Sequence, residues 1–391
     1  VSKLGLKTHL SGSSDSGASA LFTDGKWVRE DPVSAEAWEK LDGVLGVPNP
    51  DNISLKDALI DAGLRGEVLE AAERMCSVGA PMLPEKLSAR NASEIHHCFD
   101  SFSDPITGVS RTGNPNFRLV DGYSNLWKKM SGPISELIHF DTPVTKLVWS
   151  AGQVEAHTPV GTFEAKTVIV TLPVGVLQSG SLSFDPVLPH SKTEAIDTFD
   201  PGPLILVTAE FKHRWWEKVI GNVPNFRGDT KSPFRTGYKC YFSDIPGPPV
   251  LTAHIGTPDA NILTGDHERI SSLFMTDLSE MFPEEDLDSE LVNIDVTDWP
   301  SDPWTMGGIS VVPVGKYQAR ADLAAPTPPL FWAGEATHTR GYAECVHGAL
   351  ETGRRAAFEV LHSIQPMRAD GTNTSLDWWQ YTPSKGPSGL G

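Results

Sequence analysis

The stretch from Leu330 to Leu361 constrains the fold and function of this chain more than any other segment. A short apolar run stops at Gly334-Glu335, a polar loop that contains glycine follows, and a long helical pattern begins near Val346. A strand, a glycine turn and a helix in this order bring backbone N–H groups and the positive end of a helix beside one small volume. The stretch therefore predicts a binding site for an anionic cofactor.

Length and charge limit the classes of protein to which the chain can belong. It has 391 residues and no apolar run long enough for a membrane-spanning helix, which favours one large domain or two interwoven domains. The formal net charge of −18 argues against nucleic acid as a partner, because phosphates repel such a surface. The charge either draws cationic amines toward the protein or reflects an ordinary acidic surface. Cysteine and histidine spacing predicts no metal site.

Apolar periodicity predicts an α/β chain. Helical spacing predicts helices over 35–41, 55–62, 66–75, 192–197, 267–281 and 346–361, with Asn52 or Ser54 as the cap of the second. Short β runs predict strands over 137–140, 144–149, 153–157, 168–172, 204–211, 238–242, 250–255, 291–296 and 330–333. Residues 364–391 are rich in Gly, Pro, Ser and Asp and are expected to form a C-terminal surface arm.

Six motifs occur along the chain in a fixed order. They are Asp121-Gly122-Tyr123-Ser124, Thr142-Pro143-Val144, the strand from Val168 to Leu177, Phe184-Asp185-Pro186 with Leu188-Pro189 and Lys192, Asp302-Pro303-Trp304 with Gly307-Gly308, and Ala333-Gly334-Glu335 with Val346-His347-Gly348-Ala349. The set resembles the flavin amine oxidases, which include polyamine oxidases, monoamine oxidases, L-amino-acid oxidases and lysine-specific histone demethylases. The likeness covers roughly residues 117 to 363.

The resemblance implies an FAD-dependent two-domain fold. Residues 117–183 and 326–363 would form a discontinuous Rossmann-type FAD-binding domain, and residues 1–116 and 184–325 a substrate-binding domain with a mixed sheet and helices. In the family a strand, a Gly-x-Gly-x-x-Gly turn and a helix open the fold, and no such turn occurs in this sequence. The FAD domain is therefore expected to lack its first βαβ unit, through truncation or natural loss, and the chain to copurify with little or no FAD.

The resemblance also implies a reaction between a small-molecule amine and O2. Hydride passes from the amine-bearing carbon to flavin N5, the imine hydrolyses, and O2 reoxidises the flavin with formation of hydrogen peroxide. The positions that match the family's FAD contacts are Val144, Thr171, Leu172, Trp304, Gly334, Glu335, Cys345 and Val346. Tyr342 would form one aromatic wall of the amine pocket. His338 and His347 are expected to orient the loop by hydrogen bonds.

Two residues depart from the family's pattern. Leu206 stands where the family usually has a lysine beside flavin N5, and Ile309 where many members have an aromatic residue of the amine-binding cage. Leucine has no proton to exchange, and isoleucine has no ring face for a cation. These departures leave two alternatives to an amine oxidase open. One is a flavin oxidoreductase with an apolar substrate, and the other is a catalytically degenerate protein that acts as a binding or scaffold module.

Overall fold

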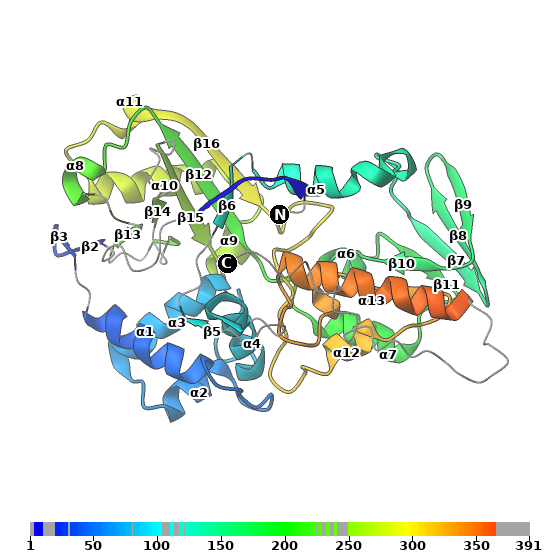
Figure 1. Cartoon of the computed structure of the whole chain (residues 1–391). Coiled ribbons are helices and arrows are strands. Elements are labelled where there is room, and N and C mark those ends of the chain that lie inside the picture. Colours follow the sequence, from blue (N-terminus) through cyan, green and yellow to red (C-terminus); the bar gives the residue numbers. More distant parts are fainter. Residues whose placement is uncertain are drawn as a thin grey trace, which may run out of the picture.

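The computed structural model describes residues 4–10, 20–29, 32–79, 81–103, 110–112, 117–120, 122–221, 223, 225–228, 232–234, 238–240 and 249–364. Four helices from the first part of the chain, at the lower left of Figure 1, pack around one apolar core. They are α1 (Pro32–Leu45), α2 (Leu55–Asp61), α3 (Gly66–Gly79) and α4 (Ala89–Asp100). Helix α2 begins at Leu55 because the Ser54 side chain accepts the N–H of Asp57, a cap worth about 1 kcal/mol.

A seven-stranded mixed sheet joins strands from the beginning and the middle of the chain. Its order is β16-β12-β15-β14-β13-β2-β3. The strands are β2 (Ala20–Thr23), β3 (Lys26–Val28), β12 (Ile205–Phe211), β13 (Asn225–Gly228), β14 (Tyr238–Cys240), β15 (Val250–Ile255) and β16 (Leu291–Asp298). Alternate residues of β12, such as Ile205 and Val207, are buried in a core with helix α10 (His267–Met281). Leu206 and Thr208 therefore lie on the opposite face of the sheet.

Two parallel strands position the cofactor segment predicted from the sequence. Strand β10 (Val168–Val170) pairs with β17 (Leu330–Trp332), which is buried at all three residues. Helices α6 (Val174–Gln178), α7 (His190–Thr198), α12 (Ala319–Ala324) and α13 (Val346–Ile364) lie near β10 (Figure 1). The short 3-10 helix η3 (Glu335–Thr337) contacts α12 and α13. Because the strands are parallel, their carboxyl ends meet at one edge.

The remaining elements are smaller. A sheet of order β11-β7-β8-β9, at the right of Figure 1, contains β7 (Lys146–Ser150), β8 (Gln153–Thr158), β9 (Gly161–Ala165) and β11 (Ser183–Asp185). Strand β1 (Thr8–Leu10) pairs with β6 (Phe117–Leu119), and β4 (Ser101–Ser103) pairs with β5 (Ser110–Thr112). Short helices α8 (Glu217–Ile220), α9 (Asp259–Leu263) and α11 (Leu287–Glu290) connect strands of the large sheet.

Helix α5 (Ser124–Ser131) and the 3-10 helix η2 (Gly132–Leu137) have no buried residue. Four of their apolar side chains, together with that of Phe140, are between 41% and 75% exposed, and we call this set the α5 face: Trp127, Met130, Ile134, Leu137 and Phe140. A short amphipathic helix usually buries such a face against another element. In Figure 1, α5 runs along the upper edge of the molecule.

Most of the predicted elements are confirmed within the described residues. The helix over 267–281 and the strand over 250–255 match α10 and β15 to the residue. The strand predicted over 137–140 is wrong, because these residues end η2 and form a turn. The strands among the first 115 residues were not predicted. Residues 241–242 of one predicted strand, Asp121 of the first motif and residues 365–391 of the predicted arm lie outside the described residues.

Among the described residues, no helix is long and apolar enough to cross a bilayer. In the same part of the chain, no three His, Cys, Asp or Glu side chains come together as ligands for a metal ion.

Candidate functional site

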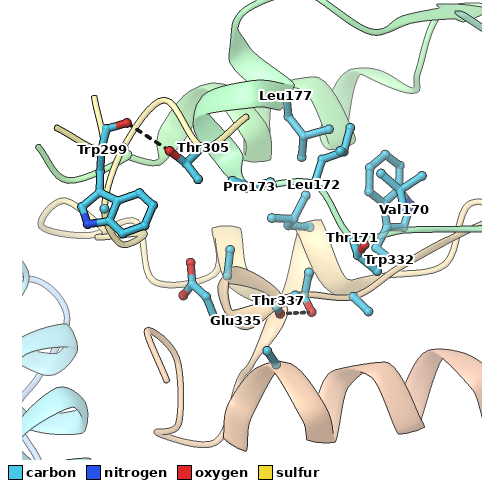
Figure 2. Close-up of a pocket in the computed structure, with 17 residues that line it drawn as sticks. Val170, Thr171, Leu172, Pro173, Leu177, Trp299, Thr305, Trp332, Glu335 and Thr337 are labelled. Carbon is cyan, nitrogen blue, oxygen red and sulfur yellow. Dashed lines mark hydrogen bonds between the residues drawn. The ribbon is translucent and has the colours of Figure 1, made fainter. Parts of the chain in front are cut away.

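A cavity of about 330 Å³ lies where β10 and β17 end. Thr171 and Leu172 follow β10, and Gly334 and Glu335 follow β17. Figure 2 shows Glu335 and Trp299 on one side of the cavity, and Leu172, Pro173 and Leu177 on the other. Ligands of open α/β sheets bind outside the carboxyl ends of parallel strands, so this cavity has the position of a cofactor site.

The turn after β17 depends on glycine. Gly334 has a φ of 116°, which residues with a side chain rarely adopt. The hydroxyl of Thr352 on α13 accepts the N–H of Gly334 at 3.1 Å and lies 3.0 Å from its carbonyl oxygen. The turn is thereby fixed to α13, and its backbone faces the cavity without a side chain.

Three donors hold the carboxylate of Glu335. The backbone N–H of Ser310 donates to Oε1 at 3.2 Å, and the Ser310 hydroxyl donates to Oε2 at 2.8 Å. The backbone N–H of Glu344 donates to Oε2 at 2.7 Å. Glu335 therefore joins the strand end, the loop after β16 and the loop before α13, and its position at the cavity wall is fixed.

A buried ion pair lies behind Glu335. The guanidinium of Arg320, on α12, is 3.5 Å from Oε1 of Glu344, and both side chains are almost completely buried. Asn91 on α4 donates to the same Glu344 oxygen at 3.3 Å. Burial raises the pKa of the Glu344 carboxyl well above its usual value, although Arg320 opposes this shift. The other oxygen of Glu344, Oε2, is buried and has no hydrogen-bond partner among the described residues.

His338 organises the loop between η3 and α13. Its Nδ1 accepts the backbone N–H groups of Arg340 at 3.2 Å and Tyr342 at 3.0 Å, so this nitrogen carries no proton. Its Nε2 therefore carries the proton and donates to Glu351 at 3.0 Å. The arrangement needs a neutral imidazole, as expected for a residue that orients the loop rather than acts as a base.

The stability of the protein is expected to fall in mild acid because of His338. Burial lowers the pKa of His338, more than Glu351 raises it. The unfolded chain therefore binds this proton more readily, and the stability from neutral His338 is present above about pH 6.5 and is lost as the pH falls. Urea unfolding between about pH 8 and pH 5 should show this loss, and the variant His338→Gln should show less of it. Identical pH profiles for the two proteins would contradict the assignment.

The structure brings four of the predicted cofactor contacts together. Thr171, Leu172, Gly334 and Glu335 line the cavity. The other predicted contacts, Val144, Trp304, Cys345 and Val346, are not among the described residues that line it. Val144 precedes β7, Trp304 is 65% exposed, and Val346 begins α13. Their contacts with a cofactor stay a prediction.

The predicted substrate contacts lie around the cavity rather than in its wall. Leu206 on β12 pairs with Thr297 on β16, two residues before the cavity residue Trp299. Ile309 precedes Ser310, which holds Glu335. The Tyr342 ring packs edge-on to the His347 ring, with centroids 4.8 Å apart. These three assignments also stay predictions.

Several cavity residues were missed in the sequence. Trp299, Thr305 and Thr337 line the cavity. The Thr305 hydroxyl donates to the carbonyl of Trp299 at 3.0 Å, and the Thr337 hydroxyl to that of Gly334 at 2.9 Å (Figure 2). Trp299 lies just before the motif Asp302-Pro303-Trp304, whose own tryptophan is the one that matches the family pattern. Thr337 lies in the signature stretch itself.

Comparison with known proteins shows the family and the relatives of this chain. Residues 79–361 match the family model of flavin-containing amine oxidoreductases. The chain is 28% identical to human lysine-specific histone demethylase 2 over 249 residues, which cover 62% of this chain and 30% of that protein. It is 34% identical to polyamine oxidase 2 of Arabidopsis thaliana over 222 residues, which cover 55% of this chain and 43% of the relative. The chain thus spans less than half the length of these two relatives.

Solved structures share the fold. A putrescine oxidase bound to putrescine superposes with a TM-score of 0.73 at 19% identity, covering 92% of this chain and 84% of that one. Cyclohexylamine oxidase from Brevibacterium oxydans has a TM-score of 0.71 at 17% identity, covering 92% and 83%. These likenesses confirm the expected α/β amine-oxidase fold, and the family model confirms the resemblance seen in the motifs. The chain belongs to the flavin-containing amine oxidoreductase family.

Proposed function

We propose that this chain is an FAD-dependent oxidoreductase that oxidises an amine. The observation that carries the proposal is the cavity at the carboxyl ends of β10 and β17, with Glu335 held in its wall by three donors. Bound FAD supplies the two-electron acceptor that protein side chains lack. Membership of the flavin-containing family supports this choice of cofactor.

Two features of the cavity wall support a ligand with an anionic group, namely the glycine turn and the beginning of helix α13. Gly334 lines the cavity without a side chain, so a ligand can approach its backbone, and its φ of 116° favours glycine at this position. Ala349, in the first turn of the long helix α13, also lines the cavity, which brings the positive end of that helix near it. We propose residues 117–183 and 326–363 as the FAD-binding domain and residues 1–116 and 184–325 as the substrate-binding domain.

An amine as substrate is supported by the relatives and by charge. The similar proteins carry the names polyamine oxidase, putrescine oxidase and cyclohexylamine oxidase. A net charge of −18 attracts cationic amines at long range. Tyr342, whose ring lies beside His338 and His347, would provide an aromatic wall for the substrate. Oxidation would then consume O2 and release hydrogen peroxide, as in the expected family reaction.

The test is a titration of the purified chain with FAD, followed by amines. Saturable binding is expected to quench tryptophan fluorescence, because Trp299 and Trp332 line the cavity, and to give bound absorbance at about 450 nm. No Gly-x-Gly-x-x-Gly occurs in the chain, so excess FAD is required and little is expected to copurify. Putrescine, spermine and cyclohexylamine are then added without oxygen, and one of them is expected to bleach the absorbance. Absence of saturable binding would overturn the cofactor assignment.

The leucine at position 206 supports a second candidate function, that of a flavin protein that does not oxidise amines. Leucine at this position can neither carry charge nor exchange a proton, and Ile309 supplies no ring for an amine. The candidates are an oxidoreductase with an apolar substrate and a binding or scaffold module. FAD binding without bleaching by any of the amines would favour this group over the first proposal.

The substitution Leu206→Lys is expected to raise the rate at which O2 reoxidises the reduced cofactor in FAD-loaded protein. A positive charge near the reacting oxygen stabilises negative charge that develops there, provided that burial does not lower the lysine pKa too far. The substitution is also expected to cost stability, because an amine replaces packed methyl groups. Stopped-flow reoxidation and the melting temperature measure the two effects. A folded, FAD-loaded variant that reoxidises no faster than its parent would show that Leu206 does not occupy the lysine position.

A further inference from the structure

Arg320 lies outside the cavity, yet its guanidinium holds the groups that hold Glu335. The side chain is 1% exposed. Its Nη1 donates to the Ser310 hydroxyl at 3.0 Å and to the Ala336 carbonyl at 3.3 Å. Its Nη2 donates to the Ser310 carbonyl at 2.9 Å and to Oδ1 of Asn91, also at 2.9 Å. The one guanidinium therefore fixes the hydroxyl and the carbonyl of Ser310, and the carbonyl of Ala336, the residue that follows Glu335.

A second connection runs from Arg320 through Glu344. The Glu344 side chain pairs with Arg320, and its backbone N–H donates to Glu335. Glu344 has a φ of 65°, a conformation that non-glycine residues adopt only where contacts hold them. The pair with Arg320 and the bond from Asn91 supply such contacts. The Glu335 carboxylate thus cannot turn without displacing Ser310 or Glu344, and Arg320 contacts both.

We propose that Arg320 is a positioning residue that sets the orientation of the Glu335 carboxylate toward the cofactor cavity. The inference rests on the proposed function of that cavity as the FAD site. The planar fork of arginine is essential here, because it serves Ser310, Ala336 and Asn91 at once, whereas the single ammonium of lysine has no such geometry. Through Asn91 the same fork connects helix α4 to the cavity, so the helical part of the molecule contributes to the cofactor site.

The test is a double-mutant cycle between Arg320→Lys and Glu335→Ala. FAD dissociation constants and midpoints of urea unfolding are measured for the parent, both single variants and the double variant. Arg320→Lys is expected to weaken FAD binding by about tenfold in the parent. In the Glu335→Ala background it is expected to change binding less than about twofold, because the group that it positions is absent. The shift of the unfolding midpoint should likewise be smaller in that background.

Lys192→Met is the matched control. Lys192 is 3% exposed and donates to carbonyls at the end of the same helix, those of Asp322, Leu323 and Ala325, at 2.6 to 2.7 Å. It contacts neither Ser310 nor Glu344 in the described hydrogen bonds. Its loss should lower the unfolding midpoint by the same amount with and without Glu335.

The two proposals fail separately. If the parent binds no FAD, the proposed function falls, and the unfolding cycle alone then decides the role of Arg320. Additive effects of Arg320→Lys and Glu335→Ala on unfolding, and on FAD binding where it occurs, would overturn the positioning role. The positioning role would be established if Arg320→Lys and Glu335→Ala had non-additive effects while Lys192→Met and Glu335→Ala had additive effects.

Discussion

Replacing Gly348 by alanine is expected to destabilise the protein by about 3 kcal/mol or more. Gly348 lies in the first turn of α13, and a Cβ there would stand 1.7 Å from the carbonyl oxygen of Tyr342. The obstacle is backbone, which cannot rotate away as a flexible side chain can. The loop that carries Tyr342 and Glu344 must therefore move, and the bond from Glu344 N–H to Glu335 would be lost with it. Urea unfolding measures the stability, and FAD titration measures the effect on the cavity.

Gly353 provides the control on the same helix. An alanine Cβ there would meet no atom within 4 Å. Gly353→Ala is expected to stabilise the protein by about 0.5–1 kcal/mol, because alanine loses less conformational entropy in a helix. If Gly348→Ala and Gly353→Ala unfolded at the same urea concentration, the close approach of α13 to Tyr342 would be refuted.

Replacing Glu335 by alanine is expected to weaken FAD binding by about tenfold to a hundredfold. The substitution removes the cavity's acid and also leaves three donors, two from Ser310 and one from Glu344, without their acceptor. The loops after β16 and before α13 would then lose their common point of attachment. Fluorescence titration of the variant with FAD gives the dissociation constant.

Glu351→Ala is the comparison for this variant. Glu351 lies on α13, is 38% exposed at its side chain and pairs with His338, but it does not line the cavity. Its loss should disturb the loop through His338 and weaken FAD binding less than Glu335→Ala does. Equal dissociation constants for the two variants would remove Glu335 from the site.

Four cavity residues could be predicted from the sequence because each pair directly follows an apolar strand. Gly334 and Glu335 follow one strand, and Thr171 and Leu172 follow another, so motif and periodicity place all four. Arg320 and Asn91 gave no such signal. They meet only through tertiary packing across 229 positions, and neither belongs to the six motifs that resemble the flavin amine oxidases. A buried arginine cannot be distinguished from a surface arginine by its neighbours in sequence.

The wrong prediction of a strand over 137–140 also arises because burial cannot be seen in the sequence. An apolar run is read as a strand on the assumption that its side chains are buried. Leu137 and Phe140 are instead 75% and 70% exposed, at the end of η2 and in the turn that follows. The run is apolar, but its side chains are not buried in this part of the molecule.

The α5 face has a consequence for how molecules of this protein behave toward one another in solution. Its aromatic and aliphatic groups attract the same groups on a neighbouring molecule, while the net charge of −18 keeps the two molecules apart. Added salt shortens the range of the repulsion, to about 10 Å at 0.1 M, but leaves the apolar attraction in place. Self-association should therefore increase with ionic strength, the reverse of the trend for assemblies held by ion pairs, and dilute buffers of low salt should keep the protein monodisperse.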